Sequence, residues 1–201
     1  MQNLPSAASR MSGNPSLRID IPPKQMGEDL YFHEKCGKNV VLINSGLTAY
    51  RRDPEEEAYY GEVFTHRHLF DNELFEVTID EKIGKWNSYS FGIGVTVQNP
   101  AVELPQWLHD MEDCSWYMYG NDVYHFGDNL IEGYGFDIRN IKEGDRLGVM
   151  RKDNGTLHFF LNDVDMGPSV TDVPSGVYGI IDIGGCTVRA TIVSSSTPIS
   201  R

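Results

Sequence analysis

The chain has 201 residues, of which 11% are aromatic and 20 are glycine, and its formal net charge is −12. This length suits one domain with tails, and the composition is typical of many short strands joined by tight turns. The excess of acid repels phosphate backbones and anionic lipid headgroups, so we expect neither nucleic acid nor a membrane surface as a partner.

The first residues of the chain, 1–29, combine Ser, Pro, Asn and Met in no periodic order, which predicts a disordered tail or linker. Three basic and three acidic residues balance there, so the excess of acid belongs to the rest of the chain. We expect an ordered domain over residues 30–193 and a second disordered tail over residues 194–201. No apolar run approaches the roughly 18–20 residues of a membrane span, and no signal-peptide layout is seen, so we expect a soluble, cytoplasmic protein.

Short strand patterns dominate the middle of the chain, and no amphipathic helix of convincing length interrupts them. Such a series predicts an all-β fold, either a sandwich or a barrel. About twelve strands are expected, over residues 40–43, 48–51, 62–65, 74–80, 91–96, 115–119, 123–126, 146–151, 156–161, 164–166, 177–182 and 187–193.

One stretch, DNGTLHFFLNDVDMGP (residues 153–168), predicts a meander with two tight turns. The tripeptide DNG and the dipeptide ND supply residues that tolerate positive φ where hairpins need them. Between the turns, Leu157, Phe159 and Leu161 share one face of a strand and His158 lies on the other. We therefore expect His158 to point outward, away from the apolar row.

Three connections interrupt the strands, at residues 52–61, 82–89 and 97–114, and they are rich in aromatic and acidic side chains. Long loops on a rigid sandwich are where binding residues concentrate. An interface there would combine aromatic anchors with an acidic rim, which favours a partner of basic or polar character. The candidate partner-binding residues are Glu56, Tyr59, Tyr60, Trp86, Tyr89, Trp107 and Asp113. For Trp86, packing against the fold is favoured over binding.

The side chains that could ligate a metal are scattered along the sequence. The three cysteines are far apart and odd in number, so neither a disulfide framework nor a paired zinc motif is visible. His66 and His68 would share a strand face, but an arginine separates them and no third ligand is near in sequence. We therefore expect no metal and no cofactor.

No catalytic motif is evident either. Glu76 and Asp80 share a strand face, but the strand separates them by roughly 13 Å, which exceeds the spacing of glycosidase carboxylate pairs. Gly92 and Gly94 fall inside a strand pattern, so they indicate close packing or a bulge rather than a phosphate-binding loop. We expect no enzymatic activity.

Four separated blocks of sequence, in order along the chain, resemble the neuralized homology repeat. The blocks are FHEKCGKNVVLINSGLTAYRR (32–52), LFEVTIDEKIGKWNSYSFGIGVT (74–96), GDRLGVMRKDNGTLHFFLNDVDMGP (144–168) and PSGVYGIIDIGGCTVRATIV (174–193). The resemblance covers essentially all of residues 31–193.

This resemblance implies a SPRY-like, two-sheet antiparallel β-sandwich that binds a protein or peptide and has no catalysis of its own. It also implies a ubiquitin-ligase-associated or scaffold protein of the cytoplasm or centrosome, with this domain as one repeat of a longer chain. The alternative is a carbohydrate-binding, lectin-like sandwich, because sugars would stack on the same loop aromatics.

Overall fold

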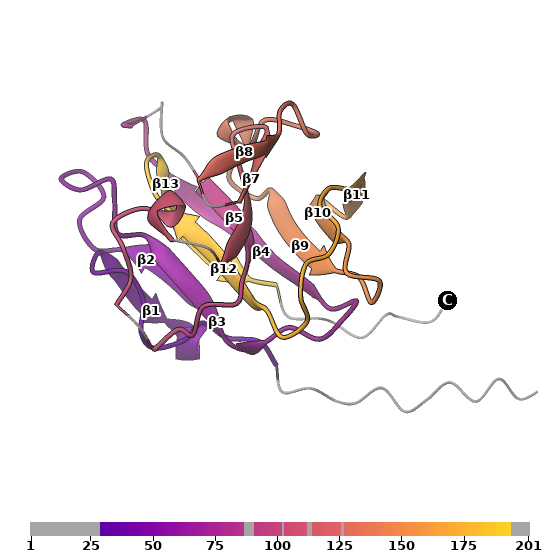
Figure 1. The fold of residues 1–201 in the computed structure, drawn as a ribbon. Helices are drawn as coiled ribbons and strands as arrows, with labels where there is room; N and C mark the ends of the chain where they lie inside the picture. Colours follow the sequence, from indigo (N-terminus) through magenta and orange to yellow (C-terminus); the bar gives the residue numbers. More distant parts are fainter. Residues whose placement is uncertain (1–28, 87–90, 102, 112–113, 126, 194–201) are drawn as a thin grey trace, which may run out of the picture.

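The computed structural model describes residues 29–86, 91–101, 103–111, 114–125 and 127–193. In these ranges the chain forms two antiparallel sheets that pack face to face (Figure 1), and its only helices are three short 3-10 turns. The expected two-sheet antiparallel sandwich is therefore confirmed. The two predicted tails, apart from Asp29, and the candidate residues Tyr89 and Asp113 lie outside the described residues.

The first sheet has seven strands in the order β1-β2-β13-β4-β9-β10-β11. Its strand β13, the last in sequence, lies between β2 and β4 and so joins the two ends of the domain. The bounds are β1 Val40–Ile43, β2 Thr48–Arg51, β4 Leu74–Lys82, β9 Arg146–Arg151, β10 Leu157–Leu161, β11 Val164–Pro168 and β13 Thr187–Ile192.

The second sheet has six strands in the order β3-β12-β5-β6-β7-β8. The bounds are β3 Glu62–His68, β5 Phe91–Thr96, β6 Ser115–Tyr119, β7 Asp122–His125, β8 Asp128–Ile131 and β12 Tyr178–Ile183. The expectation of about twelve strands missed β8. This edge strand reads DNLI and is largely exposed, so neither alternation nor an apolar run marks it in the sequence.

The main core fills the space between the two sheets. Because strand side chains alternate, β4 directs Phe75, Val77 and Ile79 inward, where all three are fully buried. From the opposite sheet, Ile181 and Ile183 of β12 join the same cluster. Each such side chain contributes roughly 1.5–3 kcal/mol on burial, so this interface supplies most of the drive to fold.

The predicted meander over residues 153–168 is present as strands β10 and β11. Asn162 and Asp163 have φ of 49° and 69°, the two positive values that a type I′ hairpin turn needs. Leu157 and Phe159 are fully buried in the core, as their shared face predicts. His158 lies on the opposite face, where its Nδ1 is 2.9 Å from Oδ1 of Asp165 on the neighbouring strand.

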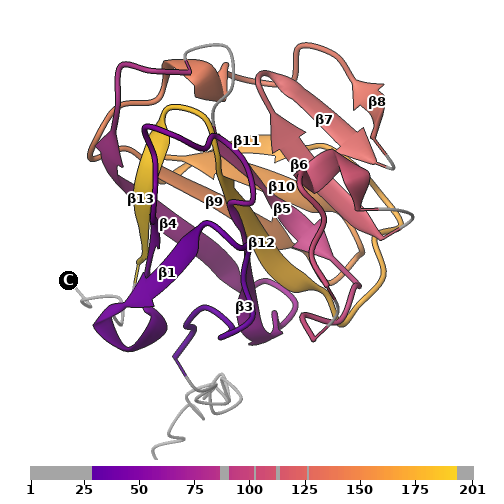
Figure 2. The same ribbon diagram turned by 90° about the vertical axis from the view of Figure 1, so that its left-hand side faces the viewer.

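The outer face of the six-stranded sheet is also covered in part. The connection between β5 and β6 crosses in front of this sheet (Figure 2), and it contributes Leu108 and Met111 to a second, smaller apolar cluster. Phe64, Tyr117 and Ile180 complete that cluster from the outward positions of β3, β6 and β12. The central strands of this sheet are thus buried on both faces.

Candidate functional site

The strand register of the six-stranded sheet places an acidic row across its outer face. Glu62 is paired with Asp182, Asp182 with Gly92, Gly92 with Tyr119, and Tyr119 with Asp122. Because paired residues point to the same side of a sheet, these five positions form one line over five strands. The glycine in the middle of the row has no side chain, and the Leu108 side chain lies over this position.

A second, mostly apolar row runs beside the first. Phe64, Ile180, Gly94, Tyr117 and Tyr124 are paired in the same way across β3, β12, β5, β6 and β7. A Cβ atom on Gly94 would lie 2.1 Å from the carbonyl oxygen of the next strand, which no side chain tolerates. The glycine is therefore required for close packing, as the sequence indicated.

Gly92, the glycine of the first row, leaves room for the covering loop to approach the sheet. A Cβ atom on Gly92 would lie 3.1 Å from Cδ2 of Leu108, which descends from the 3-10 turn Leu108–Asp110. The turn is thereby held close to the sheet, with Trp107 and His109 on either side of the inserted leucine.

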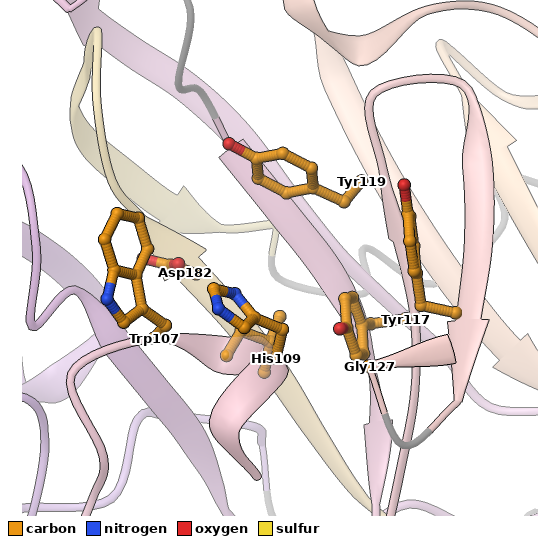
Figure 3. Close-up of a pocket in the computed structure, with 8 residues that line it drawn as sticks. Trp107, His109, Tyr117, Tyr119, Gly127 and Asp182 are labelled. Carbon is orange, nitrogen blue, oxygen red and sulfur yellow. The ribbon is translucent and has the colours of Figure 1, made fainter. Parts of the chain in front are cut away.

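Between the covering turn and the sheet lies a hollow of about 300 Å³. This volume is at the lower end of the range for ligand pockets, so the hollow is large enough for one or two side chains of a partner. Figure 3 shows that the side chains around it come from the covering turn and from the outward positions of β6, β7 and β12. The principal lining residues are Trp107, His109, Tyr117, Tyr119, Tyr124 and Asp182.

The walls of the hollow are aromatic. On the covering turn, the rings of Trp107 and His109 have centroids 5.3 Å apart. On the sheet side, the rings of Tyr117 and Tyr124 stack at 5.5 Å with an interplanar angle of 11°. Flat aromatic faces on two sides favour a planar or elongated apolar group between them.

The floor of the hollow is acidic. Asp182 lines it and is 1% exposed, while Glu62, beside it on β3, is fully buried. Burial, followed by the neighbouring Asp182 carboxylate, holds the pKa of Glu62 well above its usual range. Neither carboxylate oxygen of Glu62 has a hydrogen-bond partner in the described part of the chain.

A buried hydroxyl also borders the hollow. Tyr117 is 3% exposed, and its hydroxyl has no hydrogen-bond partner among the residues described. Burial raises the pKa of this phenol far above its usual value, and the nearby Tyr124 and acids add to the effect, so the hydroxyl keeps its proton. An unmatched buried polar group costs about 1–3 kcal/mol, and a ligand that meets it recovers this energy.

The three loops named from the sequence lie side by side. The backbone N–H of Tyr60 donates to the carbonyl of Gln106 at 3.2 Å, which joins the first loop to the third. Nε1 of Trp86 donates to the carbonyl of Pro54 at 3.1 Å, which joins the second loop to the first. The loops therefore form one continuous edge.

The candidate partner-binding residues occupy different places on that edge. The Tyr59 ring packs against the ring of Trp107, a lining residue of the hollow, with centroids 4.0 Å apart. The Lys38 ammonium lies 5.2 Å from the centre of the Tyr60 ring, and Glu56 is exposed. Trp86 is half-buried at the Pro54 contact, which supports packing there without testing any role in binding.

Most residues of the hollow were not predicted as binding residues from the sequence. The predicted set contains Trp107 but not His109, Tyr117, Tyr119, Tyr124 or Asp182. A signal was present for some of them, because SWYMY places two tyrosines on one strand face and an acid interrupts the apolar strand YGIIDI. What no local pattern could show is that these strands are neighbours.

The other groups considered for chemistry make structural contacts. Glu76 is buried with its Oε2 3.6 Å from a guanidinium nitrogen of Arg146, and Asp80 accepts a hydrogen bond from Thr191. His66 stacks on Tyr31, with ring centroids 3.4 Å apart. Across the described ranges, no three His, Cys, Asp or Glu side chains gather as a metal site would require. No helix in those ranges is long and apolar enough to cross a bilayer.

Comparison with known proteins gives one family match and several structural ones. The family model described as Neuralized matches residues 32–194. The crystal structure of the Drosophila melanogaster Neuralized NHR1 domain has a TM-score of 0.65 at 21% identity and covers 84% of this chain and 100% of its own. The solution structure of the NHR domain in Drosophila melanogaster Neuralized also has a TM-score of 0.65 at 21% identity, covering 87% and 96%. The SPRY domain of human HERC1 follows with a TM-score of 0.58 at 12% identity, covering 83% and 99%. At these identities, the structural matches establish a shared fold.

Proposed function

The chain belongs to the Neuralized family, and from that premise we propose that it binds a protein or peptide ligand at its loop edge and the hollow beneath. NHR and SPRY-like domains are protein-interaction modules and are generally non-catalytic. The observation that carries the proposal is the convergence of three loops beside an aromatic hollow whose buried Tyr117 hydroxyl is unmatched in the described residues.

The chemistry of the hollow supports a binding role. Interface energy concentrates in a few aromatic and arginine anchors that fill desolvated pockets. Trp107, packed against Tyr59, offers an aromatic surface of this kind beside the hollow. The exposed acids of residues 52–57 form a rim that accelerates association with a basic partner more than it slows dissociation.

The wider setting of the domain is proposed from the sequence resemblance. We propose that the chain is one repeat of a longer, ubiquitin-ligase-associated or centrosomal scaffold protein, cytoplasmic or centrosomal in location. Among the family, its blocks look most like the repeats of neuralized-like protein 4.

The test is a selection from a random peptide display with the full chain as bait, followed by affinity measurements with variants. Trp107→Ala should weaken the selected peptides by at least about tenfold, because it removes one wall of the hollow. Phe70→Ala is the matched control, since Phe70 is an exposed aromatic that follows the far end of β3. Equal affinities for the parent and Trp107→Ala would refute the site, and saturable binding to glycans with none to peptides would favour the lectin-like alternative.

A further inference from the structure

One buried side chain holds both ends of the first loop of the edge, residues 52–61. Asn39 directly precedes β1 and is 6% exposed. At the start of the loop, its Oδ1 accepts a hydrogen bond from the backbone N–H of Asp53 at 3.1 Å. At the other end, its Nδ2 donates to the carbonyls of Glu57 and Tyr59, at 3.1 and 3.4 Å. The Asn39 amide therefore fixes the distance between the two ends of the loop.

The end of this loop contains a strained residue. Tyr60 has a φ of 61°, a left-handed value that is rare and costly for a bulky side chain. Its carbonyl accepts a hydrogen bond from the backbone N–H of Asn39 at 3.3 Å. A Cβ atom on Gly37 would lie 2.1 Å from the same carbonyl oxygen, so this approach requires glycine. Strain of this kind persists only where the surrounding structure imposes it, and such residues cluster at functional sites.

We propose that Asn39 is a positioning residue for partner binding, which holds the first loop in the conformation that the partner recognises. This inference rests on the proposed function and names the group that orders that site.

The part of the loop that Asn39 holds also makes the contacts with the third loop. The Tyr59 ring packs against Trp107, and the backbone N–H of Tyr60 donates to the carbonyl of Gln106 at 3.2 Å. The exposed acids of the rim lie between the two ends that Asn39 holds. A partner therefore meets aromatic and acidic groups whose backbone is already ordered. Such order removes an entropic cost from association, so the apparent Kd should rise as the ordered fraction of the loop falls.

Two variants in the full chain separate the contacts at the two ends. Asn39→Ala removes all the side-chain hydrogen bonds, whereas Asn39→Asp keeps an oxygen that accepts from Asp53 but cannot donate to the carbonyls at the other end. Hydrogen exchange measured by NMR follows each end separately. The Tyr60 N–H should exchange at least about tenfold faster in both variants, and the Asp53 N–H should do so only in Asn39→Ala. If Asn39→Ala does not fold, Asn39→Asp carries the same test.

Affinity for the display-selected peptides is measured on the same proteins. Both variants should bind at least about fivefold more weakly than the parent, because both release the end that carries Tyr59 and Tyr60. Bound peptide should restore slow exchange of the Tyr60 N–H in the variants, since the partner reorders the loop at its own cost. A residue that serves stability alone would not produce this recovery.

Asn162→Ala is the matched control. The Asn162 side chain also ties a turn, because it donates to Asp145 at 3.0 Å and accepts from the backbone N–H of Arg146 at 2.8 Å. This turn joins β10 and β11 of the other sheet. The control should unfold at a lower temperature than the parent and keep the parent affinity for the selected peptides.

Three results would overturn the inference. Fast Tyr60 exchange with parent affinity would show that the partner does not depend on loop order, and slow exchange in both variants would show that Asn39 does not hold the loop. An equal loss of affinity in Asn162→Ala would attribute the effect to stability. Trp107→Ala separates these failures from failure of the proposed function. If it abolishes binding while the Asn39 variants bind like the parent, the site stands and the positioning role is wrong.

Discussion

The two faces of the six-stranded sheet differ in chemistry although the same strands build both. On β12, Ile181 and Ile183 point into the apolar core, whereas Ile180 points outward into the second apolar cluster and Asp182 points outward to the hollow. The inner face stabilises the fold, and the outer face holds polar groups that are costly to bury. A strand whose inward residues pack this well can carry an acid on its other side, and buried polar groups that cost stability cluster at functional sites.

The largest effect that separates the two faces should come from Phe75→Ala. This side chain is fully buried in the core, it meets Phe32 edge to face, and a Cβ on Gly179 would fall within 2.4 Å of its ring. Truncation leaves a cavity that the opposing backbone cannot fill, so we expect a loss of about 3–5 kcal/mol in unfolding free energy. Denaturant titration measures it, and a loss below 1 kcal/mol would mean that the inner face is not the stabilising one.

Trp86→Ala, at the loop edge, should lower the unfolding free energy less than Phe75→Ala does in the core. Trp86 is half-buried and donates a hydrogen bond to Pro54, so its removal should cost about 2 kcal/mol. The same titration applies, with selected-peptide affinity as a second readout. Parent-like stability together with lost peptide binding would assign Trp86 to recognition instead of packing.

On the outer face, Glu62→Gln should raise the unfolding free energy, whereas the two changes above lower it. The pKa of Glu62 is raised in the folded protein, so its contribution to stability is full below its unfolded pKa and is lost as pH rises. Asp182 and Asp110 strengthen this effect by repulsion. The variant should therefore gain roughly 1–2 kcal/mol at pH 8 and nothing below pH 4. A variant that is less stable than the parent at pH 8 would show that the carboxylate is matched by a cation.

The smallest change is expected for Tyr117→Phe in the free protein. Because the hydroxyl has no partner among the described residues, removing it should raise the unfolding free energy by about 1 kcal/mol, the lower end of the cost of an unmatched buried polar group. Thermal unfolding of the two proteins side by side measures this difference. A loss well above 1 kcal/mol would indicate that the hydroxyl stabilises the unliganded fold.

Features set by local sequence patterns could be predicted, whereas features set by the pairing of distant strands could not. The hairpin at Asn162-Asp163 and the inward alternation of β4 are local patterns, and both are present as predicted. The hollow depends on β12 lying in the same sheet as β6 and β7, which are far from it in sequence, so no local pattern could bring Asp182 to these tyrosines or pair it with Glu62. The exposed strand β8 lacked even a local signal, because edge strands with polar residues on both faces show no alternation.

The central place of β13 in its sheet has a consequence for biosynthesis. Because β13 is hydrogen-bonded to both β2 and β4, these two strands have no partner between them until the last part of the domain has been translated. The order of synthesis therefore delays completion of the sheet, and contacts that span the whole domain make such folds slow. A nascent chain arrested before β13 would present two open strand edges, which are templates for aggregation and targets for chaperones.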